Sequence, residues 1–168
     1  MKKLLAFLII CIATITICPV KAQTLEKELA TFEEKPITFL QKQLIAKPTI
    51  EQLKKQIPKG YSLADETKKM IIFERIIGNK HYEITYMFDE NQKIFTIMFS
   101  SHANRTFNIM DEFTNLGYTK DESLTGMLQK GIEVISYKNR KLKHTGMITI
   151  NENIKQLTVV LSSKGYKE

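Results

Sequence analysis

The feature that most constrains the fold of this chain is a strand-turn-strand pattern that occurs twice, at residues 86–101 and 148–163. Aligned without gaps, the two segments share matching apolar positions and several identical residues. The identical pairs are Glu90/Glu152, Asn91/Asn153, Lys93/Lys155, Thr96/Thr158, Ser100/Ser162 and Ser101/Ser163. Because apolar and polar residues alternate on both sides of the turn, each segment predicts a β-hairpin with one apolar face. The repetition therefore indicates an architecture, and by itself it says little about chemistry.

A helix, a Gly-Tyr pair and a polar stretch precede the strands in both repeats. Apolar spacing predicts the helices, and Gly60-Tyr61 and Gly117-Tyr118 mark where they end. The polar stretches are 62–69 and 119–130, and strands are predicted at 70–77, 81–89, 93–101, 132–137, 143–151 and 155–163. We therefore predict an α+β fold, a tandem duplication of an α-β-β-β unit. Its antiparallel sheet has helices packed on one face and is preceded by an N-terminal helical arm.

The first residues predict an export signal. Lys2 and Lys3 precede an uncharged apolar run at 4–17, and Ala22 is a small residue at the expected cleavage position. The run is shorter than the roughly 20 apolar residues that span a bilayer. We expect a mature protein that starts at Gln23 and is periplasmic or secreted, with lipidation at Cys18 as the alternative.

The remaining chain divides at changes of pattern. We assign 1–22 to the signal peptide, 23–47 to the helical arm, 48–103 to the first repeat and 104–168 to the second, with 23–168 as one compact domain. In the arm, apolar residues recur at spacings of three and four and are interrupted by Pro36. This pattern predicts two short helices or one helix kinked at the proline.

Charge and cysteine content exclude several functional classes. The full chain carries +7, and loss of Lys2, Lys3 and Lys21 with the signal leaves 7 − 3 = +4, which is too weak to indicate nucleic-acid binding. Both cysteines, Cys11 and Cys18, precede the predicted cleavage site. The mature chain then has no thiol for a disulfide, a nucleophile or a zinc site. We predict no cofactor and no metal.

The hairpins predict a register as well as a face. A tight turn at Glu90-Asn91 places Tyr86 opposite Phe95, Ile84 opposite Ile97 and Tyr82 opposite Phe99. The same turn in the second hairpin places Ile148 opposite Leu157, Gly146 opposite Val159 and His144 opposite Leu161. A slip of one residue would turn every apolar side chain to the other face.

The opposite face of the hairpins is rich in Thr and Met, and it would form one broad surface if the repeats join edge to edge. Methionine side chains adapt to varied partners, so we name Thr85, Met87, Thr96 and Met98 as candidate binding residues. The alternative is that the N-terminal arm covers this face and that Thr serves only as a good strand former.

A cluster of basic residues is predicted at a turn of the second repeat. Its members are Lys138, Arg140, Lys141, Lys143 and His144. A basic loop of this kind could bind an acidic protein or an envelope polyanion. The alternative is a solvated turn, which is common for charge runs.

No catalytic motif stands out. His81, His102 and His144 lack the spacing of a metal site, and the adjacent acids at 111–112 and 121–122 fit solvated pairs. The layout resembles that of small exported inhibitor and PepSY-type modules over about the last two-thirds of the chain, without their signature residues.

The function we expect is an exported non-enzymatic binding module, inhibitor-like or immunity-like, that recognises a macromolecular partner through the sheet face or the basic hairpin. One alternative is a small envelope hydrolase with its site between the repeats, using carboxylates and His144. A second alternative is an envelope-associated structural adaptor. The sequence does not indicate which oligomeric state the protein adopts.

Overall fold

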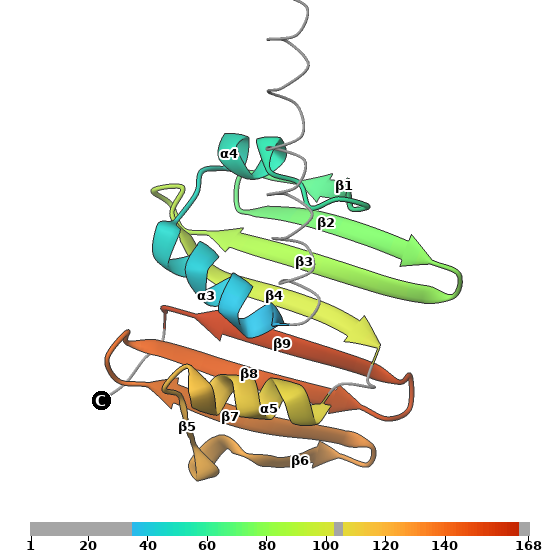
Figure 1. The fold of residues 1–168 in the computed structure, drawn as a ribbon, viewed down its shortest axis with the longest axis vertical. Coiled ribbons are helices and arrows are strands. Elements are labelled where there is room, and N and C mark those ends of the chain that lie inside the picture. The colour runs from blue at the N-terminus through green and yellow to red at the C-terminus, as the bar shows by residue number, and fades with distance from the viewer. Residues whose placement is uncertain (1–34, 103–105, 165–168) are drawn as a thin grey trace, which may run out of the picture.

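The computed structural model describes residues 35–102 and 106–164, apart from the side chains at 106, 107, 127 and 128 (Figure 1). The predicted signal peptide, its cleavage site and the first part of the arm lie outside these residues. Within the described part, no helix is long and apolar enough to cross a membrane.

The described chain forms one antiparallel sheet. Its strands are β1 (Ser62–Glu66), β2 (Met70–Ile77), β3 (Lys80–Phe88), β4 (Ile94–His102), β5 (Thr119–Lys120), β6 (Gly126–Gln129), β7 (Ile132–Asn139), β8 (His144–Asn151) and β9 (Gln156–Ser162). Eight strands lie in the order β1-β2-β3-β4-β9-β8-β7-β5, and β6 also pairs with β7. Because β4 pairs with β9, the earlier and later strands belong to one continuous sheet. The α+β class and the antiparallel sheet are confirmed.

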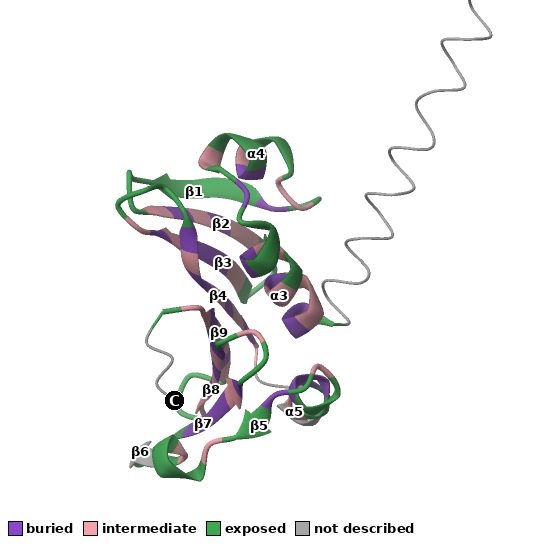
Figure 2. Ribbon diagram, turned by 90° about the vertical axis from the view of Figure 1, so that its left-hand side faces the viewer, coloured by how far each residue is buried: buried purple, intermediate pink, exposed green. Residues whose placement is uncertain are grey.

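The described α-helices lie on one side of this sheet (Figure 2). They are α3 (Pro36–Ala46), α4 (Ile50–Lys55) and α5 (Thr106–Asn115), and a short 3₁₀ helix, η1, spans Glu122–Leu124. Thr49 and Gln52 form a capping box that starts α4. Gly117 follows α5 with a φ of +79°, a conformation that suits glycine at a helix end.

Helix α3 covers the centre of the sheet. Its Ile37, Leu40 and Leu44 are fully buried, and the helix packs over β4 and β9 and against α5. Pro36 occupies the first turn, where its missing N–H costs nothing, so the proline starts the helix instead of kinking it. The expectation that the arm covers the Thr/Met face is wrong for residues 36–46, because they lie on the apolar face.

The hairpins keep the predicted faces but not the predicted register. The structure pairs Ile84 with Phe99, Tyr86 with Ile97, Ile148 with Val159 and Gly146 with Leu161, two residues away from the prediction in both hairpins. The turns are longer than a two-residue turn, and Gln92 and Lys155 adopt positive φ of 58° and 53° in them. In the first hairpin, a bulge also places Phe88 opposite Ile94 and leaves Phe95 without a partner in β3. A shift of two residues restores the same face, so the apolar pattern could not detect it.

The polar stretches before the first strands contain edge strands that the sequence did not predict. β1 lies in the first stretch, and β5, η1 and β6 lie in the second. All five residues of β1 are exposed, so it has no alternation of apolar and polar residues to reveal it.

Gly146 is required by the close approach of α5 to β8. A Cβ at this position would overlap the Phe113 ring and would lie 2.9 Å from its Cζ. The ring cannot retreat easily, because it stacks on Tyr137 at 4.3 Å between centroids and meets the edge of Tyr118 at 5.1 Å.

We therefore expect Gly146→Ala to lower the free energy of unfolding by about 1 to 2 kcal/mol, the cost of overpacking less the gain of replacing a strand glycine. Gly126→Ala is the control, because a Cβ there meets nothing within 4 Å. Denaturant unfolding measures both variants. Equal stability of the two would contradict the packing of α5 on β8.

Candidate functional site

The face of the sheet opposite the α-helices is the broadest candidate surface. Among the described residues no α-helix lies over it (Figure 2), and the 3₁₀ helix η1 lies at its β7 edge, where Ser136 Oγ donates to the Leu124 carbonyl at 3.1 Å. We call this face of the sheet the open face. The predicted residues meet there in two cross-strand pairs, Thr85 with Met98 and Met87 with Thr96. The threonines are buried between their neighbours, whereas both methionines are half-buried. The structure thus brings these four residues together on β3 and β4.

The open face continues across the β4–β9 junction. Register extends the Thr85–Met98 pair into one row across six strands. The members of the row are Ile72, Thr85, Met98, Val160, Met147 and Ser136. The sequence placed Thr85 and Met98 on this face, but it did not predict the order of the row across the sheet, because that order depends on the β4–β9 pairing.

Hydroxyl pairs flank this row at the junction. Thr96 Oγ1 donates to Ser162 Oγ at 2.9 Å, and the hydroxyls of Ser100 and Thr158 lie 3.1 Å apart. Polar atoms on both sides of the apolar row are therefore engaged with each other. The central part of the open face is an apolar strip bordered by satisfied hydroxyls.

The predicted basic cluster is spread over different environments. Lys138 lies on the open face and forms an ion pair with Asp121 at 2.8 Å, and this contact lowers the pKa of Asp121. Arg140 and Lys141 are exposed in the turn, and Lys143 has a φ of 53° there. The structure therefore does not gather the five predicted residues on one basic surface.

His144 lies on the helix-covered side and is only 6% exposed. Its Nδ1 has no hydrogen-bond partner within the described chain. Burial lowers the pKa of this imidazole, and the charge of Lys47 lowers it further. Because it is buried on this side, His144 is separated from the exposed basic residues of the turn.

Glu112 differs most from the prediction made from the sequence, which treated it as a solvated acidic residue. It is 8% exposed and accepts hydrogen bonds from the backbone N–H groups of Ile37 and Thr38, at 3.2 and 2.6 Å. The hydroxyl of Thr38 donates to it as well, at 2.7 Å. A side chain of α5 therefore caps the first turn of α3, where N–H groups lack partners within the helix. The sequence has no signal for this contact, because it joins residues that are 74 and 75 positions apart.

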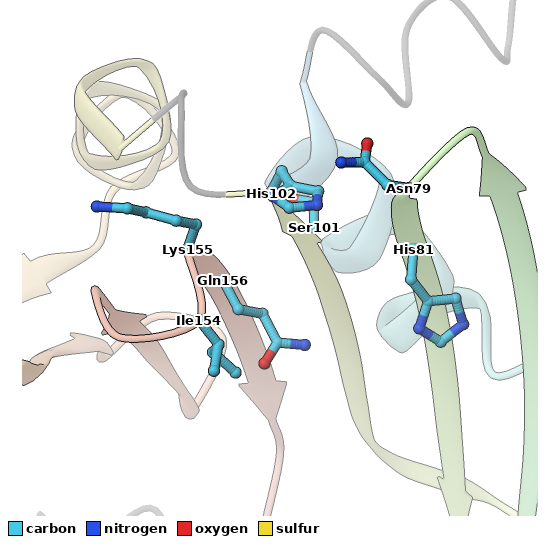
Figure 3. A pocket seen from close by; sticks show the side chains of 7 residues that line it. All are labelled: Asn79, His81, Ser101, His102, Ile154, Lys155 and Gln156. Atoms are coloured by element: carbon cyan, nitrogen blue, oxygen red, sulfur yellow. The ribbon is translucent and has the colours of Figure 1, made fainter.

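A shallow hollow of about 230 Å³ lies near the tips of the β2–β3 and β8–β9 hairpins (Figure 3). It is lined by Asn79, His81, Ser101, His102, Ile154, Lys155 and Gln156. The β3–β4 pairing ends at Glu83 and Ser100, whereas β4 stays paired with β9 as far as His102. Figure 3 shows the Lys155 ammonium directed away from the other lining side chains. The lining residues are mostly exposed and do not converge on one point.

No group of three or more His, Cys, Asp or Glu side chains within the described ranges is arranged to hold a metal ion. The rival hypothesis placed a hydrolytic site between the repeats. At that place β4 and β9 are hydrogen-bonded to each other, and α3 covers them on the apolar side. Comparisons with descriptions of protein families, with curated proteins and with solved structures found no match.

Proposed function

We propose that this protein is an exported, non-enzymatic binding module that recognises a macromolecular partner through its open face. The observation that carries the proposal is the row from Ile72 to Ser136, which presents two methionines, an isoleucine and a valine across neighbouring strands. These four side chains are half-buried, so each keeps part of its surface accessible to a partner, and methionine adapts to a partner's shape.

The edges of the sheet are less suited to binding than its face. β1 is short and ends in Asp65 and Glu66, and a bulge follows Leu63 in its pairing with β2. The other edge of the sheet is divided between β5, with two residues, and β6, with four. Short, charged and bulged edges discourage the addition of a further strand. A partner would therefore have to approach the face.

The basic hairpin is a weaker candidate for the contact. Lys138 is neutralised by Asp121, and His144 lies on the helix-covered side. The exposed pair Arg140 and Lys141 remains as a solvated turn. Inhibitor-like or immunity-like roles stay within the proposal, because such proteins often use one preformed surface.

The chain is also proposed to derive from a tandem duplication. Both halves run in the order helix, glycine with φ near +80°, buried tyrosine and edge strand, and both end in three longer strands, although the second half also has η1 and β6 before these. The glycine-tyrosine pairs are Gly60-Tyr61 and Gly117-Tyr118, and the last strands of the halves, β4 and β9, pair at the centre. In this arrangement the open face is assembled from equivalent strands of both halves.

The test is capture of partners from the native envelope fraction by three forms of the protein. We expect Met98→Glu/Met147→Glu to lose the partners that the wild type retains, because both charges enter the apolar row. Arg140→Ala/Lys141→Ala serves as the matched surface control and should retain them. If the first variant retains the partners and the second loses them, the binding surface is the basic turn and not the open face. Thermal melts check that all three forms are folded.

A further inference from the structure

Carboxylates gather at one corner of the open face. Glu74 on β2 lies directly opposite Glu83 on β3, and Asp65 on β1 is paired with Ile72 beside them. Like charges placed directly opposite on one face of a sheet destabilise it. The ion pairs of Lys54, Lys120 and Lys138 are formed with other carboxylates, Glu51, Glu66, Glu122 and Asp121. The corner is therefore a local excess of negative charge.

The contacts around the two glutamates only partly offset this repulsion. Thr85 Oγ1 donates to Glu83 Oε1 at 2.8 Å, and His81 Nε2 lies 3.2 Å from Glu74 Oε2. Both His81 and Glu74 remain accessible, with side-chain exposures of 49% and 36%. A cationic group from outside could reach the pair and relieve the repulsion.

The acidic corner borders the apolar row. Ile72 and Thr85 stand next to Glu74 and Glu83 along the same strands, and Met98 follows on β4. The sign of the corner is opposite to the net charge of the whole chain, which is +7. A partner that complements this face must therefore offer apolar side chains and, next to them, positive charge.

We propose that the partner binds through a cationic, apolar protein segment, with a Lys or Arg placed between Glu74 and Glu83 and apolar side chains over the methionines. This inference rests on the proposed function and specifies the chemistry of the partner. Charge complementarity selects the occupant, because the contacts of Thr85 and His81 offset only part of the repulsion between the two carboxylates.

The chain's own N-terminal segment is a poorer occupant. Residues 23–34 contain four glutamates and one lysine, so their charge has the wrong sign for this corner. The segment also leads into α3, whose first turn is held by Glu112 on the helix-covered side of the sheet. Binding of a second copy of the chain to this face is one of the outcomes that the test distinguishes.

The test titrates two synthetic peptides of identical apolar sequence, one with lysines and one with glutamates at its charged positions. Binding is measured by calorimetry and by NMR of the methionine methyl groups. We expect the lysine peptide to shift the Met98 and Met147 signals, and its affinity to fall about tenfold or more in Glu74→Gln/Glu83→Gln. Glu90→Gln/Glu152→Gln removes two exposed turn charges as the matched control and should bind like the wild type.

The possible outcomes separate the two proposals. Equal binding of both peptides, or no loss in Glu74→Gln/Glu83→Gln, would overturn the cationic partner while leaving the open face as a binding surface. If neither peptide shifts the methionines and Met98→Glu/Met147→Glu still captures the native partners, the proposed function fails as well. Sedimentation showing a dimer that Met98→Glu/Met147→Glu dissociates would assign the face to a second copy and overturn the inference.

Discussion

Phe99→Ala is expected to lower the free energy of unfolding by about 3 to 5 kcal/mol, whereas Phe95→Ala should cost only about 1 kcal/mol. Phe99 is 6% exposed and pairs with Ile84 and Val159 on the helix-covered face. Phe95 is half-buried at the bulge, with Lys164 Nζ 4.8 Å from its ring centroid. Its contribution is therefore limited to partial burial and a weak cation–π contact.

Denaturant titration of the two variants tests the register directly. The register predicted from the sequence gives both rings the same role in the core, and so the same large loss. The observed register separates them. Similar losses for both variants would contradict the bulge and the pairing of β3 with β4. Phe95→Leu is the control, since it keeps an apolar side chain and should behave like the wild type.

The alternation of apolar and polar residues in the hairpins predicted on which face of the sheet each side chain lies. It did not predict which residue on the neighbouring strand each one pairs with. Ile84, Tyr86, Ile97 and Phe99 share the core face in the predicted and the observed register, because a two-residue shift conserves the side of the sheet. Turn length decides the partner, and it depends on positive φ at residues such as Gln92, which no hydrophobic pattern encodes. The positions of the six longer strands were therefore predicted well, whereas the residue pairs between them were not.

Long-range contacts explain the other differences. The position of α3 over β4 and β9 depends on the central pairing of two strands that are far apart in sequence. β1 was missed because all of its side chains are exposed. In the candidate surface, Thr85, Met87, Thr96 and Met98 could be grouped from alternation alone, within one hairpin. The opposition of Glu74 and Glu83 required the β2–β3 register, which lies outside the repeated hairpin.

Glu112→Ala is expected to lower the free energy of unfolding by about 2 to 4 kcal/mol, because it leaves one buried and one part-buried backbone donor without an acceptor. These donors are the N–H groups of Ile37 and Thr38 at the start of α3. Their loss should loosen the helix that covers the centre of the sheet. Hydrogen exchange should then be faster in α3 than in α5. Asp111→Ala is the matched control. Asp111 is the neighbouring acidic residue on α5 and its side chain is exposed, so its removal should change stability little.

The pH dependence of Glu112→Gln provides a second readout of the same site. Burial raises the pKa of Glu112 above its ordinary value of 4.5, and the hydrogen bonds from Thr38 and Ile37 offset part of that rise. The folded state therefore holds this proton more tightly than the unfolded state. The resulting stability is fully present below pH 4.5 and is lost as the pH rises through the folded pKa. Glutamine does not titrate, so the stability of the wild type relative to Glu112→Gln should fall as the pH rises above 4.5. A difference that grows with pH over this range would show that the hydrogen bonds outweigh burial and that the carboxylate, not the acid, is the favoured cap.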